Sequence, residues 1–238
     1  MHHSYSTIAR MNNRVVPKDA PVQKRILIYG AGGAGRTLAF FLSADKNADT
    51  SWKVDGFIDD TMPHLWGQRL ENIPLLGGYS YLDNYAGNIA MAVVTDPTAK
   101  RGLVARLKDN KSVTFPLVTS PNVLLSPHAQ LGEGCVVGHP FTLINPGSRI
   151  GDFVFILDRT GVGDYVTIGD YTTLYAGINI GAEASIGSGC VIGSGVTILP
   201  KKKIGDGSVI GAGSVVAKDI PANVVAFGSP ATVQRQLG

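Results

Sequence analysis

The sequence has little cysteine and little charge. It contains two cysteines in 238 residues, Cys135 and Cys190, and this excludes a disulfide framework and any spacing typical of a metal site. Both fall at positions typical of small core residues. Charged residues make up only 16% and the formal net charge is +3, so the composition predicts no nucleic-acid partner. The one basic cluster, Lys201 to Lys203, is typical of a solvated corner.

Long hydrophobic runs are also missing. No apolar stretch reaches membrane-spanning length, and the first twenty residues contain no secretory apolar region. We therefore expect a soluble, cytoplasmic protein without a membrane span. Residues 1–22 are polar and include Pro17 and Pro21, and we expect them to form a flexible N-terminal arm.

What the sequence does contain is a period of six residues in its C-terminal half. Twelve successive positions at this spacing are aliphatic: Ile150, Ile156, Val162, Ile168, Leu174, Ile180, Ile186, Ile192, Ile198, Ile204, Ile210 and Val216. Glycine follows most of them. The period fits neither a helix nor alternating strands, and it predicts a parallel β-helix with one aliphatic side chain per corner pointing to the axis. We attribute the glycines to corner backbone angles that a Cβ would resist.

The repeat begins near Leu131 and slips by one residue between Gly138 and Pro146, where we expect a bulge or small excursion. It predicts about five coils, or a column about 25 Å tall at the usual strand spacing. Flat exposed faces of such a column are a liability unless they are covered, and self-association into a ring is the natural cover.

The N-terminal half contains a glycine motif in a specific context. Arg25 to Tyr29 predicts a buried parallel strand, which runs directly into Gly30-Ala31-Gly32-Gly33-Ala34-Gly35 and then a helix. Such a turn lets backbone amides approach a phosphate at the positive end of the helix. A second strand, Val54 to Ile58, ends in Asp59 and Asp60, and a carboxylate there can accept hydrogen bonds from a ribose. Together these features predict nucleotide binding.

The size of this half limits the choice of nucleotide. Only about four βα units precede the repeat, whereas a full dinucleotide fold needs two βαβαβ halves. A half-size domain favours a mononucleotide or a nucleotide-linked sugar over NAD. We therefore divide the chain into the flexible arm at 1–22, an α/β Rossmann-like nucleotide-sugar-binding domain at 23–122, and an all-β parallel β-helix with a C-terminal cap at 123–238.

In combination these motifs resemble one family. The glycine turn, the segment Gly56-Phe57-Ile58-Asp59-Asp60, the six-residue repeat and the ending Ile210-Gly-Ala-Gly-Ser-Val-Val, Lys218-Asp-Ile-Pro and Gly228-Ser-Pro-Ala are similar to the sialic acid O-acetyltransferases and bacillosamine-pathway UDP-amino-sugar N-acetyltransferases. These are hexapeptide-repeat acyltransferases with a left-handed β-helix, and the resemblance covers about residues 24–234. It implies a homotrimer, a UDP-amino-sugar substrate, acetyl-CoA in the cleft between neighbouring helices, and no metal.

The resemblance also implies roles for individual residues. The uridine nucleotide would be held by Gly30, Gly32, Gly33, Asp59 and Asp60. The thioester and pantetheine would be lined by Gly193, Ser194, Gly211, Ala212 and Gly213, and Lys218 would reach the coenzyme phosphates.

One departure concerns the chemistry. The family's base is a histidine five residues before the glycine of an Ile-Gly-Asp segment, and here Gly169 places Asp164 at that position. A carboxylate is ordinarily a weaker base than imidazole, and losing a good general base typically costs about 10²–10⁴ in rate. Three interpretations stay open. Asp164 is itself the base, strengthened by burial in an apolar cleft; His139 swings in, although Pro140 suits a structural turn; or the protein binds its ligands and turns over slowly or not at all. His128 is typical of a surface corner, and His64 has no assigned role.

We therefore expect an acetyl-CoA-dependent N-acetyltransferase acting on a UDP-linked deoxy-amino sugar for bacterial surface glycans. An amine acceptor is favoured over a hydroxyl because a partly neutral amine tolerates a weaker base. The alternatives are a sugar O-acetyltransferase, a non-catalytic trimer that binds a sugar nucleotide or acyl-CoA, and a nicotinamide enzyme that uses the glycine turn.

Overall fold

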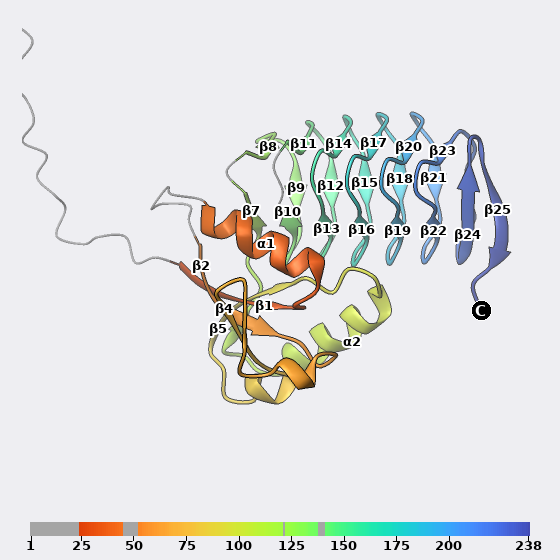
Figure 1. Cartoon of the computed structure of the whole chain (residues 1–238). Helices are drawn as coiled ribbons and strands as arrows, with labels where there is room; N and C mark the ends of the chain where they lie inside the picture. Colours follow the sequence, from red (N-terminus) through yellow and green to blue (C-terminus); the bar gives the residue numbers. More distant parts are fainter. Residues whose placement is uncertain (1–23, 45–51, 121, 138–140) are drawn as a thin grey trace, which may run out of the picture.

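The computed structural model describes residues 24–44, 52–120, 122–137 and 141–238. An α/β unit comes first, and a long column of stacked coils follows it (Figure 1). The predicted arm at 1–22 lies outside the described residues, and so does His139.

The α/β unit is built on one sheet with the strand order β3-β4-β2-β1-β5-β6. Its elements are β1 (Lys24–Tyr29), α1 (Gly33–Ala44), β2 (Trp52–Ile58), η1 (Pro63–Leu65), β3 (Arg69–Leu70), β4 (Ile73–Gly77), η2 (Tyr79–Leu82), β5 (Gly87–Met91), α2 (Pro97–Leu107) and β6 (Val113–Thr114). All pairings are parallel except the β3–β4 hairpin. The order β1, glycine turn, α1 is the one that the motif predicts.

The column consists of two-residue strands that turn a corner after each strand. They are β7 (Val118–Thr119), β8 (Leu124–Leu125), β9 (Gln130–Leu131), β10 (Val136–Val137), β11 (Leu143–Ile144), β12 (Arg149–Ile150), β13 (Phe155–Ile156), β14 (Gly161–Val162), β15 (Thr167–Ile168), β16 (Thr173–Leu174), β17 (Asn179–Ile180), β18 (Ser185–Ile186), β19 (Val191–Ile192), β20 (Thr197–Ile198), β21 (Lys203–Ile204), β22 (Val209–Ile210) and β23 (Val215–Val216). The antiparallel pair β24 (Val224–Gly228) and β25 (Ala231–Gln236) closes the last coil.

These strands form three parallel sheets, one for each face of the column. We call the sheet of β7, β10, β13, β16, β19 and β22 the docking face, that of β8, β11, β14, β17, β20 and β23 the second face, and that of β9, β12, β15, β18 and β21 the third face. The first corner leads from the docking face to the second face, the second corner from there to the third face, and the third corner back to the docking face.

The predicted parallel β-helix is confirmed. All twelve aliphatic positions from Ile150 to Val216 are buried, and each pairs in register with its counterpart in the next coil, as Ile150, Ile168 and Ile186 do. The column begins at β7, which pairs with β10, ahead of residue 123 where we place the domain division. The slip in the repeat lies between β10 and β11, and residues 138–140 of this stretch lie outside the described residues.

Our explanation of the corner glycines was wrong. The glycine after an inward aliphatic does not have a left-handed backbone; that conformation falls two residues later, for example at Tyr165 with φ 56°. A Cβ on Gly151 would instead lie 2.7 Å from the backbone nitrogen of Asp170, and one on Gly193 would lie 2.6 Å from that of Ala212. Glycine is required there because the next coil packs directly against it.

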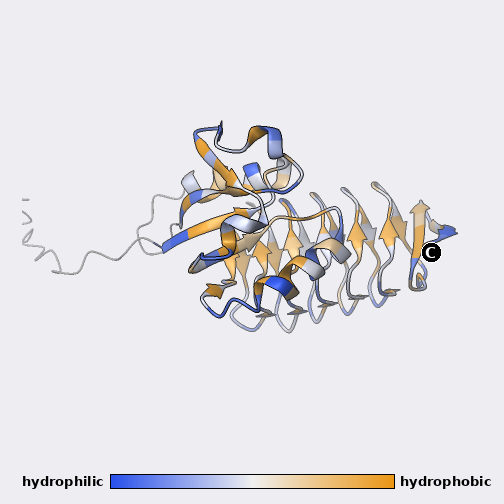
Figure 2. Cartoon of the chain, turned by 90° about the horizontal axis from the view of Figure 1, so that it is seen from below, coloured by the Kyte–Doolittle hydropathy of each residue, from blue (hydrophilic) through white to orange (hydrophobic). Residues whose placement is uncertain are grey.

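The docking face lies against the α/β unit, and this contact fixes how the two parts sit. One apolar cluster joins Leu38 and Phe57 of the unit to Val118, Val136 and Phe155 of the column. Figure 2 shows the hydrophobic strands of this face continuing past the edge of the unit. The early coils are therefore covered, whereas the coils from β19 onward are not.

Candidate functional site

The glycine turn sits where the strand order changes direction. The chain moves from β1 to β2 on one side and later returns to β5 on the other side of β1, and ligands bind at such switch points. Gly30 takes φ 109° and donates its N–H to the carbonyl of Ile58 (2.8 Å). Gly35 lets α1 approach the carbonyl of Gly30, while nothing lies within 4 Å of a Cβ built on Gly32 or Gly33. The start of α1 is therefore open to a phosphate.

The two carboxylates at the end of β2 have different environments. Asp59 is buried, and its Oδ2 accepts the Ala31 N–H (2.7 Å) while its Oδ1 accepts both the N–H (2.8 Å) and the hydroxyl (2.6 Å) of Thr61. Asp60 is exposed, although it also accepts the Tyr29 hydroxyl and the Tyr79 N–H. Asp59 thus ties the glycine turn to β2, and of the two acids Asp60 is the one that a ligand can reach.

The carboxyl end of the sheet points toward the later coils. β1 runs along the column in the direction of increasing coil number, so the glycine turn lies beside the middle of the column (Figure 1). The contacts of α2 agree with this direction. Pro97, at the start of α2, lies 3.8 Å from a Cβ built on Gly189 at the third corner, and the Arg101 guanidinium lies 5.0 Å from the ring centre of Tyr171. The start of α2 is therefore level with the coils that contain β16 and β19.

Lys100 joins the two parts and was not singled out by the sequence. It is fully buried on α2, and its Nζ donates to the Phe153 carbonyl (3.2 Å) and the Thr173 hydroxyl (3.5 Å). Burial lowers the pKa of Lys100 to about 8, against a smaller opposing effect of Cys135. Burial also raises the pKa of Cys135 and of Cys190 to about 11, so both remain neutral core thiols, as expected.

The first corner forms a bare edge beyond β16. Its turns contain Gly177, Gly195 and Gly213 in successive coils, and all three have a left-handed backbone with φ between 69° and 73°. The predicted coenzyme residues Gly193, Ser194, Gly211, Ala212 and Gly213 lie together here, and nothing lies within 4 Å of a Cβ built on Gly213. The stacked backbone thus leaves room for a long thin ligand along the edge.

Asp164 and Lys218 lie elsewhere, on the second corner. Asp164 is exposed, and its carbonyl accepts the Glu183 N–H (2.8 Å) of the next coil. A single copy therefore provides no apolar cleft around this carboxylate. Lys218 is exposed in the last turn of the same corner. The α/β unit thus covers the docking face and contacts the third corner, the predicted coenzyme residues lie on the first corner, and Asp164 and Lys218 lie on the second corner.

Two histidines, His128 and His64, lie within the described residues. His128 is exposed at the start of the second corner, where its carbonyl accepts the Gly147 N–H (3.3 Å), so the expected surface position is confirmed. His64 lies in η1, and its carbonyl accepts a hydrogen bond from Gln68 (3.3 Å).

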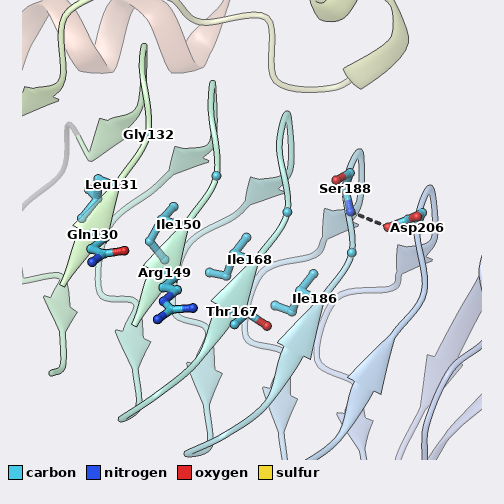
Figure 3. A pocket seen from close by; sticks show the side chains of 13 residues that line it. Gln130, Leu131, Gly132, Arg149, Ile150, Thr167, Ile168, Ile186, Ser188 and Asp206 are labelled. Atoms are coloured by element: carbon cyan, nitrogen blue, oxygen red, sulfur yellow. Dashed lines mark hydrogen bonds between the residues drawn. The ribbon is translucent and has the colours of Figure 1, made fainter. Parts of the chain in front are cut away.

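The third face carries a shallow hollow that sequence reasoning missed. Its volume is about 570 Å³, and Gln130, Arg149 and Thr167 stand outward in a row along it (Figure 3). At its end Asp206 accepts the Ser188 N–H (2.7 Å), and this hydrogen bond links one coil to the next. A second hollow of about 360 Å³ follows the second face from Leu143 to Pro200. None of the predicted substrate or coenzyme residues lines either hollow.

The described residues show no group of three or more possible metal ligands and no helix long and apolar enough to cross a bilayer.

Comparison with known proteins places the chain among hexapeptide-repeat structures. Residues 165–200 and 183–218 match the family model described as bacterial transferase hexapeptide (six repeats). No curated protein matches the chain. Among solved structures, a variant of GDP-perosamine N-acetyl transferase from Caulobacter crescentus, in complex with CoA and GDP-perosamine, is 24% identical with a TM-score of 0.77, over 89% of this chain and 97% of that one.

Two further structures agree over similar lengths. The acetyltransferase domain of PglB from Neisseria gonorrhoeae, in complex with acetyl coenzyme A, is 21% identical with a TM-score of 0.77, over 90% of this chain and 100% of that one. WeeI from Acinetobacter baumannii is 26% identical with a TM-score of 0.76, over 89% of this chain and 100% of that one. The C-terminal part of the protein is thus a β-helix of hexapeptide repeats, and the chain from the α/β unit to the cap shares its fold with these acetyltransferase structures.

Proposed function

We propose that this protein is an acetyl-CoA-dependent N-acetyltransferase that acts on the amino group of a nucleotide-linked deoxy-amino sugar. The nucleotide proposed is UDP, as the sequence resemblance implies, and the product would serve bacterial surface glycans. The proposal includes a Rossmann-like nucleotide domain, a left-handed winding of the column and assembly as a homotrimer.

One observation carries the proposal. The glycine turn follows the carboxyl end of β1, which points along the column toward the later coils, so a nucleotide-sugar held by the turn would extend toward the coils whose first corner is lined by glycine. The solved structures of the same fold include one with CoA and GDP-perosamine and one with acetyl coenzyme A. The residues present also fit the coenzyme, because a Cβ built on Gly177 or Gly195 would meet only backbone at about 4 Å, and one on Gly213 would meet nothing within 4 Å.

The chemistry requires a C–N bond to form as a C–S bond breaks. The lone pair of the sugar amine attacks the thioester carbonyl, the tetrahedral intermediate collapses with departure of the CoA thiolate, and the proton lost from nitrogen is carried away. Asp164 is the proposed acceptor of that proton. Because it lies on the second corner, away from the first corner of its own copy, we assign it to the site of a neighbouring copy in the trimer.

A coupled thiol-release assay with mass spectrometry of the sugar product tests the function. UDP-linked and GDP-linked 4-amino sugars are supplied with acetyl-CoA, and we expect one acetyl group to be added on nitrogen. Asp164→Asn should lower kcat by about 10²-fold or more, and Asp164→His should raise it, because imidazole is the better base near neutral pH.

The matched control is Asp170→Asn, which changes an exposed acid at the third corner of the same coil. It should leave the chemical step unchanged, and stability should change little because asparagine keeps an oxygen that can accept the Asp152 N–H (2.9 Å). No turnover by the native chain, with strong turnover by Asp164→His, would favour a protein that binds these ligands without reacting them. Calorimetric binding of NAD would favour a nicotinamide enzyme.

A further inference from the structure

The first corner contains one phenol where the neighbouring later coils have glycine. The residue that follows the inward aliphatic at this corner is Leu157 after β13, Tyr175 after β16, Gly193 after β19 and Gly211 after β22. Backbone hydrogen bonds keep these turns stacked: Leu157 donates to Leu174 (2.9 Å) and Tyr175 donates to Ile192 (3.0 Å). Tyr175 is thus one coil from Leu157 and one coil from Gly193, about 4.8 Å in each direction.

This position lies between the two parts of the candidate site. Leu157 packs against the apolar cluster that the docking face shares with the α/β unit, so this shared cluster extends to the first corner one coil before Tyr175. The proposed coenzyme edge begins at Gly193, one coil after it. The contact of Lys100 with Thr173 shows independently that the α/β unit reaches the strand that leads into Tyr175. A group transferred from the edge to a ligand of the glycine turn must pass this coil.

The hydroxyl of Tyr175 is available for a ligand. The side chain is partly buried, and burial raises its pKa above the usual value of 10 with no charged neighbour contributing. The phenol therefore keeps its proton at neutral pH. Within the part of the chain that the structure describes, this hydroxyl has no hydrogen-bond partner, whereas the Tyr29 and Tyr85 hydroxyls donate to Asp60 and to the Asn88 carbonyl.

We propose that Tyr175 is a catalytic residue whose hydroxyl donates a hydrogen bond to the carbonyl oxygen of the acyl thioester and to the oxyanion that forms from it. This inference rests on the proposed function and adds a group that the resemblance does not supply. A neutral donor fixed beside the reacting carbonyl stabilises the negative charge that develops on oxygen as the amine attacks. The proton stays on Tyr175 throughout, so the residue complements a separate base and does not replace it.

Substitution of Tyr175 by phenylalanine removes the hydroxyl and keeps the ring. We expect kcat to fall by about 10²-fold while the KM for acetyl-CoA changes little, because the bond strengthens in the transition state. Tyr85→Phe is the matched control. It removes a partly buried hydroxyl that donates to the Asn88 carbonyl (3.1 Å) at the start of β5, away from the carboxyl end of the sheet, so kcat should not change. Equal kcat values for the native protein and Tyr175→Phe would overturn the inference and leave the proposed function intact.

A second measurement does not depend on turnover. Isotope-edited infrared spectra of bound acetyl-CoA labelled with ¹³C at the acetyl carbonyl report the hydrogen bond directly. The thioester stretch should lie at lower frequency in the native protein than in Tyr175→Phe, both checked for native circular dichroism. The same frequency in both proteins would refute the role of Tyr175 even if no acceptor sugar were turned over. Absence of acetyl-CoA binding to the native protein would refute the inference together with the proposed function.

Discussion

Lys100 shows how docking of the two parts changes the chemistry of a single side chain. A lysine on a helix of low average hydrophobicity is ordinarily a surface residue, and nothing in the local sequence distinguishes it from Arg101 or Lys108. Here it is fully buried between α2 and the column, with only a carbonyl and a hydroxyl as hydrogen-bond acceptors. Neither acceptor carries a charge, so the ammonium ion is held at a cost in desolvation.

The stability of the protein should therefore depend on pH through Lys100. Its pKa falls from 10.5 to about 8 on folding, so between these values the unfolded chain binds more protons than the folded one, and the free energy of unfolding rises with pH. Relative to Lys100→Met, which cannot titrate, the native protein should gain about 1.4 kcal/mol for each unit of that pKa difference as pH rises from 8 to 10.5.

Urea unfolding of both proteins at pH 7, 9 and 10 measures this difference, and titration of other groups cancels in the comparison. Lys111→Met, at an exposed lysine, is the control and should show no such change with pH. A constant difference between the native protein and Lys100→Met across this range would mean that Lys100 is not desolvated in the folded state.

At the scale of elements, the period of six was sufficient to predict the column. Each coil repeats the same inward aliphatic, so the pattern in the sequence and the pattern in space are the same, from Ile150 to Val216. The reason for the corner glycines could not be predicted in this way. It depends on how closely the next coil approaches, and that distance is set by stacking between residues 18 apart, as for Ser188 and Asp206.

Gly151→Ala tests the close-approach explanation. The new methyl group would meet the Asp170 backbone, which cannot move without disturbing its own coil, so we expect a loss of about 1–3 kcal/mol in stability. Gly102→Ala on α2 is the control, since nothing lies within 4 Å of its added Cβ, and it should stabilise the helix by about 0.5–1 kcal/mol. Thermal unfolding reports both changes. If Gly151→Ala leaves the stability unchanged, close approach of the next coil is not the reason for glycine at this position.

The candidate site could be predicted only in part for the same physical reason. The glycine turn and the first-corner residues are local patterns, and each is a short continuous stretch in the structure. The different environments of Asp59 and Asp60 could not be predicted, because the Ala31 N–H and the Thr61 hydroxyl contact Asp59 only in the folded turn. The relevance of Tyr175 likewise depends on the folded chain, because Lys100 of α2 reaches Thr173 in the strand that leads into Tyr175.

At the scale of the whole molecule, the proposed site is split between corners. The α/β unit covers the docking face and the bare edge lies on the first corner, whereas Asp164 and Lys218 lie on the second corner. Corners of one rigid column cannot approach each other, because the stacked aliphatic core separates them. If both corners serve one reaction, they must belong to different copies, and a threefold ring would supply three such pairings of corners.

Mixing two inactive variants tests this division. Asp164→Asn impairs the second corner, and Ser194→Trp blocks the first corner with a bulky ring at an exposed position. When the two chains are co-expressed with different tags, random assembly gives about one quarter of the sites a native residue at both corners, so about that share of native activity should return. Each variant alone should stay inactive. If a co-purified mixed assembly is no more active than its inactive parents, the first and second corners do not act together across a subunit interface.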